Sequence, residues 1–179
     1  IETNYFFNGM QNDLVQTSLR ENFIDNETYN SEFQNNTKTD NFAHSLNTRF
    51  KHKWGNQDIS VRANVRYNDG IVDDLSERQN FNPVGELENE SVYSNHSLGD
   101  NFNFTGSVFF RKRLNDKGRS FIANLNATNG DDRRDATQRS MNDFYTNGML
   151  DRTIELNQTQ NQNDDQLNFG MRLNYTEPL

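Results

Sequence analysis

The sequence predicts an all-β protein, an antiparallel up-and-down meander of about six long strands. Apolar and polar side chains alternate along several segments, and a period of two residues is that of a β-strand with one apolar face. Two pairs of these segments are joined by short turn sequences, as antiparallel neighbours are. Polar stretches separate the pairs. These observations favour strands that run back and forth in chain order.

The clearest pair of strands is predicted at 41–54 and 57–68. Gly55-Asn56 between them suits a two-residue type II′ turn, in which glycine takes the first central position. That turn pairs Trp54 with Gln57 and places the apolar residues of both strands on one side of the sheet. These apolar positions are Phe42, Leu46, Phe50, Trp54, Ile59, Val61, Ala63, Val65 and Tyr67.

The same alternation predicts four further strands, at 1–10, 101–114, 119–129 and 166–177. The segment 115–118 forms a second short turn. The remaining connections are polar and are expected to be long loops, at 11–40, 69–100 and 130–165, with the extension of the strands into parts of these segments as the alternative. Short and long connections therefore alternate, which places all the long loops at one end of the sheet.

The composition describes an ordered but polar protein. Only 31% of the 179 residues are hydrophobic and the mean hydropathy is −1.07, values that favour disorder in a chain of net charge −8. Aromatic residues nevertheless make up 12% of the chain, and disordered chains are poor in them. The pI of about 4.8 argues against a nucleic-acid binder, which needs a basic face. No apolar run approaches the roughly 20 residues of a membrane-spanning helix.

Alternation alone leaves two architectures open, a transmembrane β-barrel and a soluble secreted β-sandwich or adhesin-like binding module. Apolar bands of about 9–13 residues match the length of a tilted strand that crosses a bilayer. Trp54, Tyr67 and Tyr175 stand at the ends of these bands, where barrels carry interfacial aromatic girdles. The alternation of short turns and long loops also fits a barrel. A sandwich would instead bury the apolar faces of 42–54 and 59–67 against a second sheet of the same chain.

The sequence contains no arrangement typical of an enzyme or of a metal site. Asn95-His96-Ser97 unites three residue types found in catalytic sites, but neighbours in a strand point to opposite faces. His44 and His52 share a face at a separation of eight residues, too far for one metal ion. The chain has no cysteine and therefore no thiolate ligand and no disulfide. We expect no catalytic residue, no cofactor and no metal.

The candidate binding residues are basic side chains on the polar face of the predicted strands. They are Arg49, Arg62, Arg66, Arg111, Arg113 and Arg172, accompanied by Lys51 and Lys53. If the apolar face meets lipid, these side chains line a lumen, where they pair with an acidic partner or guide anionic groups. The segment 69–100 is acid-rich, and we expect it to be a solvated loop, with an external mouth that attracts cations or binds divalent ions as the alternative.

Three segments resemble the TonB-dependent receptors of the Gram-negative outer membrane. FFRKRLNDKGRSFIANLNATNG, residues 109–130, is similar to a strand, a short Lys-Gly-Arg turn and a second strand of that family. LNYTEPL, residues 173–179, resembles a strand that ends in Tyr-x-Glu-Pro-Leu. NYFFNGMQNDLVQTSLRENF, residues 4–23, resembles a strand and loop closed by Arg-Glu-x-Phe. The segments follow the family's order and span nearly the whole chain.

This resemblance implies a location, a function and a set of partners. The chain would be a mid-barrel fragment, without plug, of a receptor of about 22 strands, with its long loops outside the cell. Such a receptor takes up a bulky solute (a siderophore, glycan or peptide) by energy-coupled transport and performs no covalent chemistry. The implied partners are outer-membrane lipid, the TonB complex through an N-terminal region absent from this chain, and a possible surface lipoprotein. No nucleic-acid partner is implied.

Overall fold

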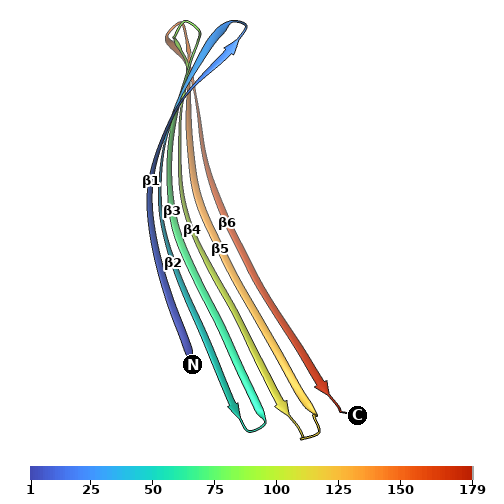
Figure 1. The fold of residues 1–179 in the computed structure, drawn as a ribbon. Coiled ribbons are helices and arrows are strands. Elements are labelled where there is room, and N and C mark those ends of the chain that lie inside the picture. The colour runs from blue at the N-terminus through green and yellow to red at the C-terminus, as the bar shows by residue number, and fades with distance from the viewer. Residues whose placement is uncertain (179) are drawn as a thin grey trace.

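Residues 1–178, described by a computed structural model, form one antiparallel sheet of six strands in chain order (Figure 1). The strands are β1 (Glu2–Ile24), β2 (Glu27–Trp54), β3 (Gln57–Phe81), β4 (Leu87–Arg113), β5 (Ser120–Thr146) and β6 (Met149–Thr176). The all-β meander predicted from the sequence is confirmed. These residues contain no helix, and thus none able to cross a membrane.

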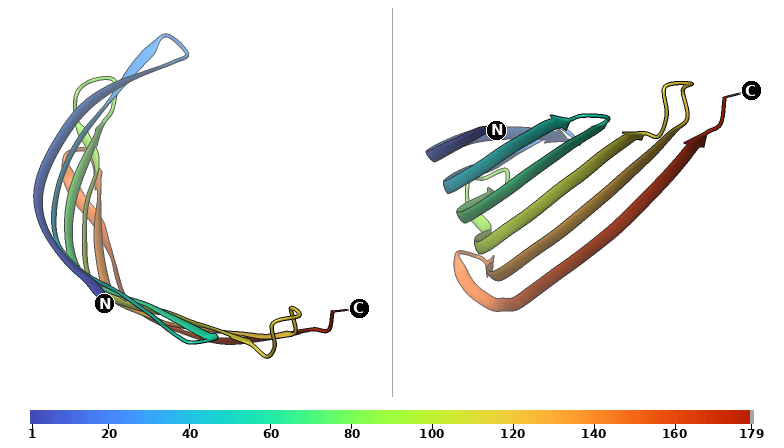
Figure 2. Two further views of the ribbon diagram at one scale, coloured as in Figure 1. Left: turned by 60° about the horizontal axis from the view of Figure 1, so that its bottom comes forward. Right: turned by 90° about the horizontal axis from the view of Figure 1, so that it is seen from below.

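The sheet is a single curved layer without a core (Figure 2). Only Ser97 and Ala136 are buried among the described residues, because side chains touch just their neighbours within the sheet. The edge strands β1 and β6 are exposed over their whole length. A second sheet, which a β-sandwich requires, is not present within residues 1–178.

The register of the β2–β3 hairpin is the one predicted. Trp54 pairs with Gln57 and Lys53 with Asp58. Gly55 has φ +52°, whereas Asn56 has no positive φ, which is the pattern of a type II′ turn. Both chain termini lie toward the same end of the sheet as this turn and the β4–β5 turn (Figure 1).

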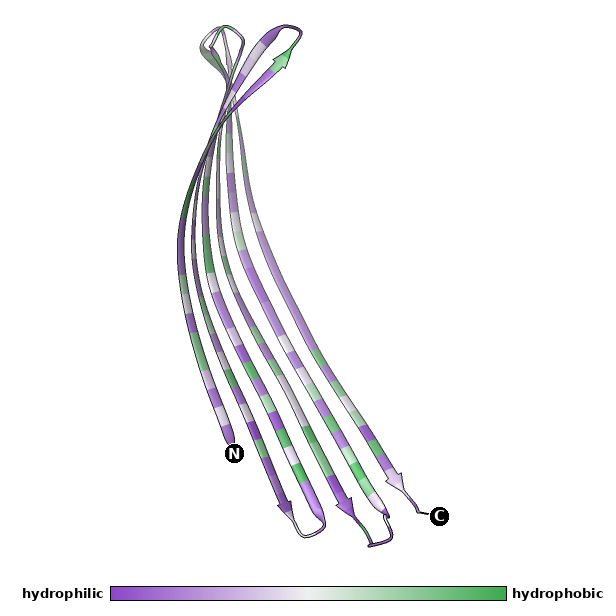
Figure 3. Cartoon of the chain, in the orientation of Figure 1, coloured by the Kyte–Doolittle hydropathy of each residue, from purple (hydrophilic) through white to green (hydrophobic). Residues whose placement is uncertain are grey.

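The pairing register divides the sheet into two chemically different faces. Phe50, Val61, Val108, Leu125 and Met171 form one continuous cross-strand row of the apolar face. The adjacent row of Arg49, Arg62, Ser107, Asn126 and Gly170 belongs to the opposite, polar face. Hydrophobic and hydrophilic positions alternate along the half of the sheet nearest the termini (Figure 3).

The apolar side chains of the apolar face gather near the end of the sheet that carries the β2–β3 and β4–β5 turns. They are called the apolar band here. The band comprises the apolar-face residues of 42–54, 59–67, 102–110, 121–127 and 167–175. Each stretch therefore contains 7 to 13 residues of a strand. Beyond the band, both faces of the sheet are mostly polar and charged, with scattered apolar side chains such as Leu19, Ile71 and Leu98.

The segments 11–40, 69–100 and 130–165 are not long loops, and this prediction was wrong. They are the continuations of the strands, which reach 23 to 28 residues, and 28 residues span roughly 90 Å. The alternation of apolar and polar residues ends before the strands do, because both faces of the sheet are mostly polar in these segments. Backbone pairing and polar cross-strand contacts sustain the sheet instead, including Thr37 Oγ1 to Asp74 Oδ1 at 2.6 Å and Gln79 Nε2 to Glu90 Oε1 at 2.9 Å.

The strands close at this far end with tight turns. Asp25 and Asn26 both have positive φ, at +49° and +68°, as do Asn147 and Gly148, at +54° and +72°. Two successive positive φ angles are the signature of a type I′ hairpin, whose twist matches that of its strands. Short connections therefore occur at both ends of the sheet, and the predicted alternation of short and long connections is wrong.

The β3–β4 and β4–β5 turns, at opposite ends of the sheet, are each held by the side chain of an asparagine. Asn82 Oδ1 accepts hydrogen bonds from the backbone N–H groups of Val84 and Glu86, at 3.1 and 2.8 Å. Asn115 Oδ1 accepts from Lys117 and Arg119 in the same way, at 3.1 and 2.9 Å. In each turn the glycine three residues after the asparagine has a positive φ. The sequence Asn-x-x-Gly thus encodes both turns.

Candidate functional site

All the predicted binding arginines lie on the polar face, in the half of the sheet nearest the β2–β3 and β4–β5 turns. The register places Arg49, Arg62, Arg66, Arg111, Arg113 and Arg172 on this face. Lys51 and Lys53 join them from β2. These residues come from four strands but share one surface, because cross-strand partners point the same way. The sheet therefore carries a basic surface in an otherwise acidic chain.

Arg49 and Arg62 form the centre of this surface. They are direct cross-strand partners, both exposed, and within residues 1–178 neither forms an ion pair. Like charges directly opposite one another destabilise a sheet. An anion placed between two guanidinium groups removes that cost and accepts their paired N–H donors.

Neutral polar groups and one carboxylate, that of Glu2, the cross-strand partner of Arg49 on β1, surround the two guanidinium groups. A hollow of about 420 Å³ is lined by both arginines together with Asn47, Asn64 and Thr105 among others. Asn64 Nδ2 donates to Asn47 Oδ1 and fixes both amides beside the arginines. This arrangement suits an anionic group that also carries hydroxyl or amide functions.

The other arginines differ in how fully their charge is compensated. Arg111 donates to Asp58 Oδ2 from Nε at 3.0 Å and from Nη2 at 2.5 Å. Arg113 exchanges hydrogen bonds with the β2–β3 turn through its backbone, its N–H donating to Asn56 O at 2.8 Å. Arg66 and Arg172 form no ion pair in the described part of the chain. The strand-end arginines thus hold the turns, while the more central ones keep an uncompensated charge.

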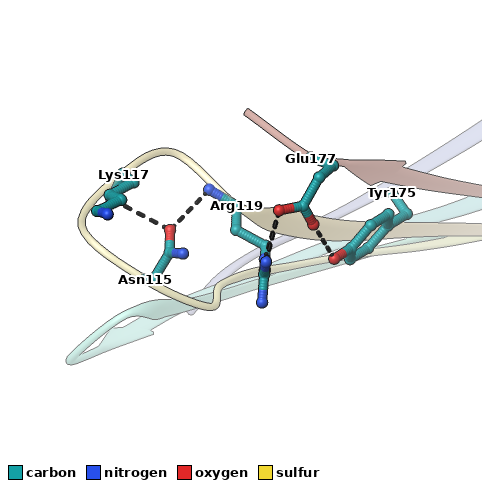
Figure 4. Close-up of polar contacts among 5 residues, drawn as sticks. All are labelled: Asn115, Lys117, Arg119, Tyr175 and Glu177. Atoms are coloured by element: carbon teal, nitrogen blue, oxygen red, sulfur yellow. Dashed lines mark hydrogen bonds and ion pairs between the residues drawn. The ribbon is translucent and has the colours of Figure 1, made fainter. Parts of the chain in front are cut away.

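Sequence reasoning missed a polar cluster that joins two of the segments singled out by resemblance (Figure 4). Arg119, in the β4–β5 turn, donates to Glu177 Oε1 from Nε at 3.1 Å and from Nη2 at 2.5 Å. Tyr175 Oη donates to Glu177 Oε2 at 2.5 Å. The signal was the opposite charge of the two segments, since β5 and β6 pair antiparallel and place their ends together. Leu179, the last residue of the Tyr-x-Glu-Pro-Leu segment, lies outside the described residues.

The surroundings of Glu177 shift its titration. The Arg119 guanidinium, and secondarily the Tyr175 hydroxyl, lower the pKa of the Glu177 carboxyl below its ordinary value. Both donors favour the charged form of the carboxylate. Glu177 therefore remains an anion in mildly acidic solution and keeps the turn joined to the end of β6.

The histidines occupy separate places on the apolar face. His44 Nδ1 lies 2.7 Å from Tyr5 Oη, and His52 stacks on Trp54 with ring centroids 5.1 Å apart. His96 Nδ1 contacts Asp73 Oδ1 at 2.5 Å. Ser97, next in sequence, lies on the opposite face and accepts from Arg134 Nε at 3.2 Å. His96 and Ser97 thus cannot act together.

The acid-rich segment 69–100 belongs to β3 and β4, not to a loop. Its carboxylates alternate between the two faces of the sheet, as Asp73 and Asp74 illustrate. Within residues 1–178 no three histidine or carboxylate side chains are grouped to hold a metal ion.

The protein is thus a single-layer antiparallel sheet with an apolar band on one face and a basic surface on the other. No protein-family model and no curated protein matches the chain. The two faces of the sheet are therefore the features that bear on its function.

Proposed function

We propose that the chain is part of the wall of a transmembrane β-barrel in the outer membrane of a Gram-negative bacterium. The apolar band carries this proposal. Its large side chains are open on the surface of a one-layer sheet; Phe169 is 77% exposed and Leu125 45% exposed. An exposed apolar surface of this extent needs another apolar phase to cover it. The lipid bilayer is such a phase, and the curvature in Figure 2 suits a barrel wall.

The dimensions of the apolar band support this environment. Its stretches of 7 to 13 residues bracket the about 9–11 residues with which a tilted strand crosses the hydrocarbon core. At the edge of the band away from the β2–β3 turn, charge appears on the apolar face of β3 and β4 at Asp69 and Asp100, which share a cross-strand row. On β5 and β6 it appears one row nearer the turns, at Asp131 and Asp165. The edge of the band is thus oblique to the strands, as a tilt against the membrane requires.

The turn end of the band carries an aromatic border. Trp54, Phe121 and Tyr175 belong to one cross-strand row of the apolar face, together with Gln57 and Lys112. Amphipathic aromatic rings are enriched where lipid meets water. This row fits the membrane interface on the side of the β2–β3 and β4–β5 turns.

Within that barrel we infer the role of a receptor for energy-coupled uptake of a bulky solute, such as a siderophore, glycan or peptide. The resemblance of residues 4–23, 109–130 and 173–179 to TonB-dependent receptors supports this role. The Arg49–Arg62 pair, which forms no ion pair within residues 1–178, fits a lumen wall that contacts an acidic group of a plug or of the solute. Coupling to TonB would be a property of the complete receptor.

Spin labelling of single cysteines tests the membrane wall, since the chain contains no cysteine of its own. Labels at Val108→Cys and Leu125→Cys are expected to collide with dissolved oxygen but not with a water-soluble nickel complex, because oxygen concentrates in lipid. Labels at Ser107→Cys and Asn126→Cys on the polar face should collide with the nickel complex. If the labels on the apolar face meet neither reagent, the face is packed in a protein core and the proposal is wrong.

An uptake assay tests the receptor role separately. Cells that produce the complete protein are offered ferric siderophores, oligosaccharides and peptides, with and without a functional TonB. We expect one solute class to accumulate only when both proteins are present. A membrane-embedded protein without TonB-dependent accumulation of any class would contradict the receptor role and leave the barrel wall intact.

A further inference from the structure

The apolar band contains a hollow at its centre. The hollow measures about 540 Å³ and is lined by side chains of four strands, among them Val61, Ala63, Gly106, Leu125, Ala127 and Phe169. Gly106 lines the hollow, and a Cβ added there would lie 2.8 Å from Cζ of Phe104, so the Phe104 ring covers this glycine. The hollow is therefore a shaped depression in a face that otherwise carries bulky side chains.

One lone charge stands on the same face, at the aromatic border. Lys112 lies on β4 in the cross-strand row of Gln57 and Phe121. From this row to the row of Leu46 and Phe104, the apolar face contains no other lysine or arginine and no carboxylate. Lys112 is half-buried, and within residues 1–178 it forms no ion pair. An ammonium group in this position attracts an anion that approaches from the apolar side.

We propose that Lys112 and the Gly106 hollow together bind one glycerophospholipid, with the phosphate at the Lys112 ammonium and an acyl chain in the hollow. The inference rests on the proposed membrane wall and adds a specific lipid site to it. The ammonium group supplies the complementary charge for the phosphate, and the aromatic border positions it at headgroup level. The lipid belongs to the leaflet on the side of the β2–β3 and β4–β5 turns.

The distance between the two parts of the site matches the length of a lipid chain. Lys112 and Gly106 lie on the same face of β4, six residues apart. Six residues correspond to about 20 Å along a strand, or to about 14 Å of depth at a tilt of about 45°. Half of the roughly 30 Å hydrocarbon core is about 15 Å. A chain anchored at Lys112 therefore ends near the bilayer midplane, where the hollow lies.

Native mass spectrometry of the complete protein, extracted from its membrane in detergent, tests the site with phosphatidylglycerol as the probe. Lys112→Gln removes the partner of the phosphate, and Ala127→Leu fills the hollow. Lys112→Gln is expected to weaken retention of the lipid about tenfold, the factor of one lost charge-assisted contact, and Ala127→Leu should also weaken it because the added side chain displaces the acyl chain. Diacylglycerol, which has the acyl chains without the phosphate, should bind the unaltered protein as weakly as phosphatidylglycerol binds Lys112→Gln.

Two matched variants serve as controls on the same face. Lys38→Gln removes a lysine beyond the apolar band, and Thr48→Leu adds bulk within the band but outside the hollow. Both should retain the lipid like the unaltered protein. Equal retention by Lys112→Gln and Ala127→Leu would overturn the lipid site while leaving the membrane wall intact. A protein that stays monodisperse without detergent would overturn the membrane wall and the lipid site together.

Discussion

Glu177 connects the end of β6 to the turn between β4 and β5, and this connection should depend on pH. Arg119, and then Tyr175, lower the pKa of the Glu177 carboxyl in the folded chain below its ordinary value of 4.5. A lowered pKa contributes stability that is fully present above the ordinary value and is lost as the pH falls through the folded value. Amide hydrogen exchange at Lys117 and Arg119 should therefore accelerate on acidification, relative to the intrinsic rate.

The variant Glu177→Gln isolates this effect. It cannot titrate, so exchange in the turn should be faster than in the unaltered protein at neutral pH and should show no further acid-induced opening. An acid-induced opening of the same size in Glu177→Gln would show that another group controls the turn.

Asn115 holds the same turn from inside through its side-chain carbonyl. Asn115→Ala removes two hydrogen bonds to backbone N–H groups, and we expect the free energy of opening of the turn to fall by about 1–2 kcal/mol. Hydrogen exchange at Lys117 and Arg119 measures this change. Asp116→Ala is the matched control, since the Asp116 side chain forms no hydrogen bond within residues 1–178. Equal effects of the two substitutions would contradict the role of Asn115.

At the scale of the element, the β5–β6 hairpin depends on the backbone conformation of its tip. Gly148 has φ +72°, a region that costs an L-residue about 1–2 kcal/mol. Gly148→Ala should therefore weaken protection from exchange at the tip of the hairpin by about that free energy. Gly99→Ala is the control, because Gly99 lies inside β4 without a positive φ and its added Cβ would meet only Arg133 O at 3.5 Å. Equal loss of protection would show that Gly148 is not conformationally required.

The sequence predicts these elements only where one face is apolar. The alternation located the parts of β2 to β6 that lie nearest the β2–β3 and β4–β5 turns. Gly55-Asn56 predicted the β2–β3 register correctly. The distal parts of the strands carry polar residues on both faces, so no period distinguishes them from loops. Asn147-Gly148 is a strong hairpin signal that would have corrected the 130–165 loop. Asp25-Asn26 is a weaker signal of the same kind.

At the scale of the whole molecule, the candidate site follows from register and not from any motif. Once the β2–β3 register is known, Arg49 and Arg62 must face each other, and the sequence was sufficient to place the arginines on one face. The Arg119–Glu177 contact joins residues 58 positions apart, so the opposite charges of the two segments become a signal only once the β5–β6 pairing is known. The sequence could not reveal the Gly106 hollow, whose walls come from four strands. Contacts between distant positions depend on the complete order of strands.

The proposed membrane wall makes the two faces of the sheet respond oppositely to a new charge, and adjacent residues of β5 provide the comparison. Leu125 lies in the apolar band and Asn126 on the polar face. Leu125→Arg places a guanidinium in the hydrocarbon and should cost about 2–4 kcal/mol of folding free energy in a bilayer, whereas Asn126→Arg faces water and should cost much less. The measurement is the urea dependence of folding of the complete protein into phosphatidylcholine vesicles. Since both variants add the same side chain to the same strand, a similar loss in both would show that the apolar face does not meet lipid.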